Sequence, residues 1–161
     1  MKRSHHMIDF IFPIALFFVF ASTALVVLLL SANIYQSIVN HSESSFQTST
    51  ALSYITEKIR QNDAGASDNI CLSEFDQQPA LAISQTYGEK VYVTYIYESK
   101  GQLKEIFLQE GITAPADSGT TIMEIADLEM TQLATDLFQF TCTATDGSTA
   151  SSIISTQSSN P

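Results

Sequence analysis

The stretch KVYVTYIY, residues 90–97, decides the fold of this chain. Valine, isoleucine and tyrosine are enriched in β-strands, so the stretch predicts a strand. Its apolar side chains fall on both alternation faces, and a sheet that is covered on one side only leaves half of them in water. We therefore expect a second layer of structure to pack against this strand.

Further strand signals follow on the C-terminal side. The run LKEIFLQ, residues 103–109, comes directly after a short turn that contains Gly101, so it predicts a hairpin with 90–97. Residues 120–125 predict another strand. The apolar spacing of 126–135 fits neither a strand nor a helix cleanly, and both remain open.

A second hairpin is expected near the C-terminal end of the sequence. Residues 137–144 and 150–155 have strand-like composition and flank the dipeptide Asp146-Gly147, which is favoured in tight hairpin turns. Together with the first hairpin, this predicts a small antiparallel sheet.

The missing layer is expected to be a helix. Residues 33–60 contain no Gly or Pro, and Leu52, Ile55 and Ile59 recur at helical spacing. Residues 40–50 are rich in Ser and Thr, which compete with helical hydrogen bonds, so we expect fraying or a bend there. The predicted fold class is α+β, a long N-terminal helix packed on a small antiparallel sheet.

The apolar run FIFPIALFFVFASTALVVLLLSA, residues 10–32, precedes this helix and contains no charged residue. At ~1.5 Å per residue, a helix of this length crosses the ~30 Å hydrocarbon layer of a bilayer. A cleaved signal peptide has a shorter apolar region, about 7–15 residues, so we favour a retained anchor. The anchor residues are taken to include Phe10, Pro13, Phe17, Phe20, Leu25 and Leu30.

The charges around this span predict its orientation. Lys2 and Arg3 precede the span and the first basic residue after it is Lys58, so the positive-inside rule places the N-terminus in the cytoplasm and the C-terminal part outside the cell membrane. Asp9 lies at the edge of the span. It either sits at the membrane surface near the positive helix N-terminus or acts in assembly.

The predicted organisation has five parts along the sequence: a cytoplasmic segment 1–9, a membrane helix 10–32, an extracytoplasmic helical extension 33–63, a sheet domain 64–155 and a disordered polar tail 156–161. From residue 33 onward there are sixteen Asp and Glu against five Lys and Arg, a net charge of 5 − 16 = −11. Such a surface repels phosphates, so we expect no directly bound nucleic acid. The apolar span makes the lipid bilayer an expected partner.

No motif points to catalysis or to a cofactor. His41 is the only histidine after the span, and no metal-ligand or phosphate-loop spacing occurs, so we expect neither an enzyme nor a resident metal. Calcium binding through Asp63, Asp68 and Asn69 or through Asp146 lacks a recognised spacing, and a hydrolase built on scattered carboxylates is the least favoured class.

Two cysteines, Cys71 and Cys142, both follow the span. A disulfide between them is one possibility in an oxidising compartment. Cys142 shares an alternation face with Phe138 and Phe140, so a small buried thiol is the other.

The order of parts, a short basic start, an apolar helix that continues as an amphipathic spine, and an antiparallel sheet, is similar to that of type IV pilins and pseudopilins. The stretches HMIDFIFPIALFFVFASTALVVLLLSANIYQSIV and YGEKVYVTYIYESKGQLKEIFLQEG also resemble an uncharacterised family of single-anchor membrane proteins from Gram-positive bacteria, which carries a domain of unknown function. The resemblance implies a pilin-like fold.

For function, the resemblance implies a minor-pseudopilin-like accessory of a type II secretion-like, pilus or DNA-uptake machine, which contacts other pilin-like subunits through its N-terminal helix. Prepilins have Gly at the cleavage point and Glu at the fifth mature position, where this sequence has His6 and Ile11. A platform or priming component that keeps its N-terminus is therefore considered as well. The alternative from another class is a tethered extracytoplasmic binding or sensory module.

Overall fold

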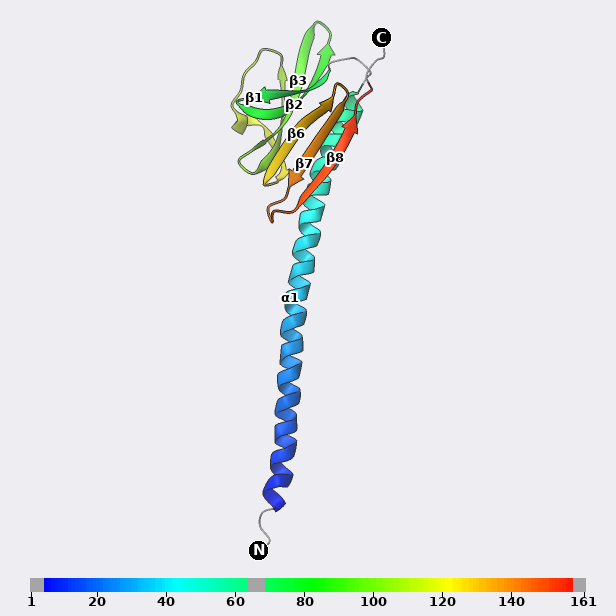
Figure 1. Cartoon of the computed structure of the whole chain (residues 1–161). Coiled ribbons are helices and arrows are strands. Elements are labelled where there is room, and N and C mark those ends of the chain that lie inside the picture. The colour runs from blue at the N-terminus through cyan, green and yellow to red at the C-terminus, as the bar shows by residue number, and fades with distance from the viewer. Residues whose placement is uncertain (1–4, 64–68, 158–161) are drawn as a thin grey trace. The chain divides into compact units, whose positions relative to one another are not determined.

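The computed structural model describes residues 5–63 and 69–157, with the side chains of 5–10, 33 and 36–44 left out (Figure 1). Its elements in chain order are α1 (His5–Asn62), β1 (Ile70–Phe75), β2 (Gln78–Tyr87), β3 (Lys90–Ser99), β4 (Gln102–Gln109), the 3-10 helix η1 (Ala116–Ser118), β5 (Thr120–Glu124), β6 (Asp127–Ala134), β7 (Leu137–Thr143) and β8 (Thr149–Ser155). The chain divides into two compact units, Met1–His41 and Ser42–Pro161.

The first unit contains the N-terminal part of α1. Its segment Ile11–Ala32 has 22 residues, a mean hydropathy of 2.6 and no buried residue. At a rise of ~1.5 Å per residue the segment is about 33 Å long, enough to cross a bilayer. By length and composition, the segment therefore qualifies as a membrane anchor or a signal sequence.

The second unit contains two antiparallel sheets. Sheet A has the order β1-β2-β3-β4-β5, and sheet B has the order β6-β7-β8. The sequence predicted one sheet, and the structure has two because the chain turns between β5 and β6. There the Ile125 side chain is fully buried and the Ala126 N–H donates to the Thr143 carbonyl at 2.8 Å, which starts the new sheet.

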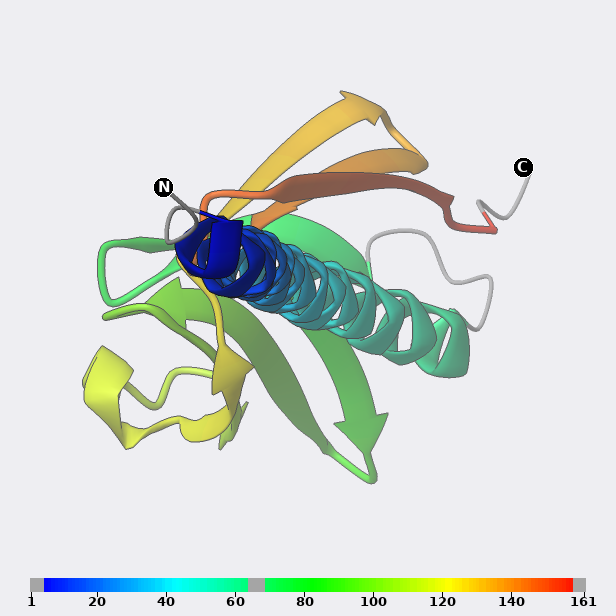
Figure 2. The same ribbon diagram turned by 90° about the horizontal axis from the view of Figure 1, so that it is seen from below.

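The C-terminal part of α1 lies between the two sheets (Figure 2). Ile55 and Ile59 are fully buried there and Leu52 is buried, which confirms the predicted stripe. These side chains share one core with residues from both sheets, among them Leu81, Ile83, Ile96 and Leu103 of sheet A and Leu128, Phe138, Phe140, Cys142 and Ile154 of sheet B. The helix is therefore the second layer that KVYVTYIY requires, and the fold class is α+β as predicted.

The other face of β3 is covered by a loop instead of a helix. Tyr97 is fully buried in a second core cluster with Phe75, Ala80 and Ala116, and Ala116 belongs to η1. The loop between β4 and β5 folds back over this face and closes it. The C-terminal part of β3, where Ile96 and Tyr97 point to opposite faces, is therefore buried on both sides.

Most of the predicted strands are confirmed. β3 and β4 form the first hairpin and β7 and β8 the second, while the open segment 126–135 is a strand, β6. α1 continues without interruption through residues 40–50, so the expected fraying is wrong, whereas a bend there stays a prediction. Thr156 and Gln157, the first residues of the predicted tail, hydrogen-bond to Asp136 and Asp63, and 158–161 lie outside the described residues.

Candidate functional site

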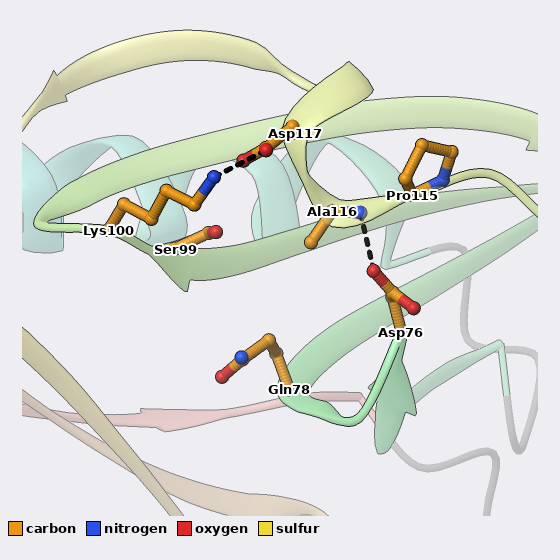
Figure 3. Close-up of a pocket in the computed structure, with 7 residues that line it drawn as sticks. All are labelled: Asp76, Gln78, Ser99, Lys100, Pro115, Ala116 and Asp117. Carbon is orange, nitrogen blue, oxygen red and sulfur yellow. Dashed lines mark hydrogen bonds and ion pairs between the residues drawn. The ribbon is translucent and has the colours of Figure 1, made fainter.

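A pocket of about 240 Å³ opens beside η1, at the end of sheet A where two hairpin turns meet the β4–β5 loop (Figure 3). We refer to it as the loop pocket. Its lining comes from the β1–β2 turn, the β3–β4 turn and the η1 loop, and consists of Asp76, Gln78, Ser99, Lys100, Pro115, Ala116 and Asp117.

Both turns that line the loop pocket use left-handed backbone conformations. Asp76 and Gln77 have φ angles of 48° and 66°, and Lys100 and Gly101 have φ angles of 55° and 75°. Two consecutive residues with positive φ match the twist of a two-residue hairpin, which brings the adjoining strands into register. The positions that carry Asp76 and Lys100 are therefore set by the turns themselves.

Hydrogen bonds fix the η1 loop over these turns. The Ala116 N–H donates to the Asp76 carboxylate at 2.8 Å, and the buried Tyr97 hydroxyl donates to the Ala116 carbonyl at 2.7 Å. Burial raises the pKa of the Tyr97 phenol, so the hydroxyl remains a donor. These contacts attach the loop to β3 and to the β1–β2 turn.

The charges of the loop pocket are partly compensated. Lys100 Nζ lies 2.5 Å from Asp117 Oδ2, with both side chains largely exposed, and the hydrogen bond from Lys100 holds the pKa of Asp117 below its usual range. Lys104 is buried beneath the loop, where its Nζ lies 3.5 Å from the Asp117 carbonyl. A buried cation is costly without an opposite charge, and Asp117 supplies one.

The lining of the loop pocket offers the carboxylates of Asp76 and Asp117, the ammonium of Lys100 and the hydroxyl of Ser99, groups that can hydrogen-bond a polar ligand. Neither Cys nor His is among the lining residues, so Ser99 has no imidazole base there. Within residues 5–63 and 69–157, no group of three or more His, Cys, Asp or Glu side chains is placed to hold a metal ion.

A family model described as Domain of unknown function (DUF4860) matches residues 46–145. The chain belongs to the DUF4860 family. The matched DUF4860 segment runs from the C-terminal part of α1 through β7 and includes the loop pocket, whereas the apolar segment Ile11–Ala32 precedes it. No curated protein and no solved structure matches the chain.

The predicted anchor residues lie in α1, before the DUF4860 segment. Pro13, Phe17, Phe20, Leu25 and Leu30 all have exposed side chains. Phe10 and Asp9 are helical, with side chains outside the described part of the structure, and Lys2 and Arg3 lie outside the described residues. The proposed roles of these residues therefore remain predictions.

The two cysteines of the DUF4860 domain lie in different sheets, Cys71 in β1 of sheet A and Cys142 in β7 of sheet B. Cys142 is buried in the core, and Cys71 is exposed on β1, with no bond between the two sulfur atoms. Strand alternation explains the separation, because Ile70 and Leu72 point into the core and Cys71 between them points away. Burial raises the pKa of the Cys142 thiol to about 11.

The acids considered for calcium make hydrogen bonds within the second unit of the chain. The Asp63 carboxylate accepts the Gln157 N–H at 2.7 Å, and Asp146 accepts the Ser148 N–H at 2.9 Å. Asn69 donates to the Asn62 carbonyl at 2.6 Å, and Asp68 lies outside the described residues.

The loop pocket could not be predicted from the sequence, since its residues come from three separate turns.

Proposed function

We propose that this DUF4860 chain is a non-enzymatic, pilin-like or minor-pseudopilin-like component of a secretion, pilus or DNA-uptake assembly. The observation that carries the proposal is that α1 has two different parts. The same helix contains the exposed apolar segment Ile11–Ala32 and the residues Leu52, Ile55 and Ile59 that fill the core of the second unit.

An exposed apolar segment of this length requires a non-aqueous environment. Burial of apolar surface stabilises by about 25 cal/mol per Å², and a bilayer or the helices of neighbouring subunits provide that burial. Ala15, Ala21, Ser22 and Ala24 are small, which permits close packing of helices within a membrane. The proposed lateral contacts therefore involve this segment and other pilin-like subunits.

The proposed orientation places the N-terminus in the cytoplasm and the DUF4860 domain outside. The support is the charge asymmetry between Lys2 and Arg3 before the span and Lys58 after it. A net charge of −11 from residue 33 onward favours solubility of an exported domain.

Site-directed crosslinking tests this proposal. The variants carry one cysteine each, at successive positions from Phe17 to Leu29, on a Cys71→Ser background and at native expression. Crosslinks to a second copy of the chain or to other pilin-like subunits should form at positions that repeat with a helical period. A cysteine at Thr131, exposed on sheet B, is the matched control and should not crosslink. A monomeric pattern at every position of the span would count against lateral assembly.

A tethered binding module is the second candidate, and the loop pocket favours it. In this case α1 serves only as a tether, so an unrelated apolar helix in place of residues 11–32 should preserve function. The assembly proposal requires the native helix surface, and the same replacement should abolish both the crosslinks and the activity of the machine.

A further inference from the structure

The hydroxyl of Ser99 lines the loop pocket without a hydrogen-bond partner in the described part of the protein. Ser99 is the last residue of β3 and is 5% exposed, and none of the hydrogen bonds among the described residues involves its hydroxyl. A buried hydroxyl whose donor and acceptor positions are unused costs free energy unless water or a ligand satisfies them. Because Ser99 lines the pocket, a bound ligand can reach this hydroxyl.

The polar groups around this hydroxyl are a mixture of hydrogen-bond donors and acceptors. Lys100 contributes donors, the Gln78 amide contributes both kinds, and the Asp76 carboxylate contributes acceptors. Oδ2 of Asp76 accepts the Ala116 N–H, and the other oxygen accepts no hydrogen bond from the described residues. Figure 3 shows Ser99 and Lys100 on one side of Ala116 and Asp76 on the other. A ligand between them therefore needs groups that both donate and accept, as a hydroxyl does.

The charges of the lining favour a neutral ligand. Lys100 and Asp117 pair with each other at 2.5 Å, so neither needs an ion from outside. An anionic ligand would lie beside the carboxylates of Asp76 and Asp117, and a cationic ligand would lie beside the Lys100 ammonium. Like charges at short distance repel, so an ion of either sign meets a repulsive group in the pocket. A neutral polar molecule meets none.

The size of the loop pocket limits the ligand to about one small ring. Its volume is about 240 Å³, below the ~300–1,000 Å³ of pockets for drug-sized ligands. The Pro115 ring and the Ala116 side chain supply the apolar part of the lining. A pyranose ring has hydroxyl groups around its edge and C–H groups on its faces, so it can satisfy the polar groups and contact the apolar ones at the same time.

We propose that the loop pocket binds one neutral hexopyranose unit, free or at the end of a glycan. The hydroxyl groups of the sugar donate to Asp76 and accept from Lys100. They exchange hydrogen bonds with Ser99 and Gln78, and a C–H face of the ring lies against Pro115. This ligand class deepens the second candidate function, the tethered binding module, and rests on it. It does not require lateral assembly through the membrane helix.

Nuclear magnetic resonance of the backbone amides of the full-length protein, in phosphocholine micelles that contain no sugar, tests the proposal. The probes are D-glucose, D-galactose, D-mannose and N-acetyl-D-glucosamine, with ethanolamine and lactate as cationic and anionic comparisons. At least one sugar should shift the amide signals of Lys100 and Ala116 with a dissociation constant of roughly 1–5 mM, as expected for a ligand of this size. Ethanolamine and lactate should shift neither signal. Methyl glycosides of the sugar that binds separate the two sources, since retained binding indicates the end of a glycan and lost binding indicates a free sugar.

Matched variants locate the contact. Ser99→Ala removes only the hydroxyl, so it should leave thermal stability nearly unchanged and weaken sugar binding by roughly 2- to 10-fold. Asp76→Asn keeps an oxygen that can accept the Ala116 N–H but loses the charge, and should weaken binding by roughly 3- to 15-fold. Ser151→Ala, at an exposed position in β8 of sheet B, should leave binding unchanged. Circular dichroism of each variant shows whether it is folded.

Three results would overturn the proposal. Equal sugar binding by the folded wild-type and Ser99→Ala proteins would place the sugar outside the loop pocket. A shift of the Ala116 signal by ethanolamine or lactate, but by none of the sugars, would remove this ligand class and keep the tethered binding module. No shift with any probe at about 50 mM, roughly tenfold above the expected dissociation constant, would count against both. The crosslinking of the membrane helix gives its result independently of all three.

Discussion

The hydroxyl of Tyr54 on α1 donates a hydrogen bond to the carboxylate of Glu105 on β4. The other oxygen of the same carboxylate accepts from Lys58 at 2.8 Å. Partial burial raises the pKa of Tyr54, and the hydrogen bond and negative charge of Glu105 raise it further, so the phenol stays protonated. This cluster is a polar attachment of the helix to sheet A beside the apolar core.

Removal of the Glu105 carboxylate should therefore loosen the helix from the sheet. Glu105→Ala leaves both Tyr54 and Lys58 without their acceptor, and we expect the free energy of unfolding to fall by about 1–3 kcal/mol. Lys58→Ala should cost less, since the Lys58 side chain is 28% exposed and water screens the ion pair. Thermal unfolding followed by circular dichroism measures both, and equal effects would contradict the central role of Glu105.

Gly119 should not tolerate a side chain. A Cβ at this position would contact the Tyr97 hydroxyl, 3.1 Å from Cζ and 3.2 Å from the Glu105 carbonyl oxygen. Because Tyr97 is fully buried, it cannot move away easily, and Gly119→Ala should destabilise the domain by about 1–3 kcal/mol.

A compensating substitution distinguishes this clash from a general effect on the loop. Tyr97→Phe removes the atom nearest to the added methyl group, so the double variant should lose less stability than the sum of the two single variants. Strict additivity would show that the contact with Tyr97 is not the cause.

The two thiols should differ sharply in reactivity. Cys71 is exposed and should react with a maleimide in the folded protein, whereas the buried Cys142 should react only after unfolding. Intact mass before and after addition of denaturant counts the labelled sites. Rapid labelling of both cysteines in the native state would place Cys142 outside the core, and no labelling without reductant would indicate a disulfide.

Stability should fall at alkaline pH, in part because of Cys142. Its pKa is about 11 in the folded protein against 9.0 ordinarily, so the unfolded chain loses this proton first. The contribution is complete below pH 9 and is lost as the pH rises toward 11, by about 1–3 kcal/mol.

The matched comparison is between Cys142→Ala and Cys71→Ala. Tyr54 and Tyr97, whose pKa values are also raised, are present in both variants, so the difference in pH dependence isolates Cys142. Cys142→Ala should show the shallower decline between pH 9 and 11, and parallel curves would contradict the assignment.

The helix layer could be predicted from the sequence because its signal is periodic. Leu52, Ile55 and Ile59 repeat at helical spacing, and β3 carries more apolar surface than one side of a sheet can bury. The loop that covers the other face could not be predicted. Its buried residue Ala116 lies among Gly, Pro and acidic residues, where no period exists to detect.

The division into two sheets could not be predicted from the sequence, for a related reason. β6 buries Leu128 and half-buries Met130, but Leu133 is 48% exposed, so the alternation of its apolar residues is incomplete. The loop pocket was hidden because Asp76 and Asp117 belong to separate turns. The sequence also gave no sign of the Tyr54–Glu105 contact, which joins residues 51 positions apart.

The hydrogen bond from the Gln157 N–H to Asp63 joins positions separated by 94 residues and ties the strand that ends the second sheet to the end of α1. Ile154 reaches the same core as Ile55 from a similarly remote position. Loop-closure entropy must be overcome before such distant contacts become favourable. The domain should therefore fold slowly, on a timescale of roughly milliseconds to seconds. The apolar face of the helix stays exposed to water until both sheets have assembled around it.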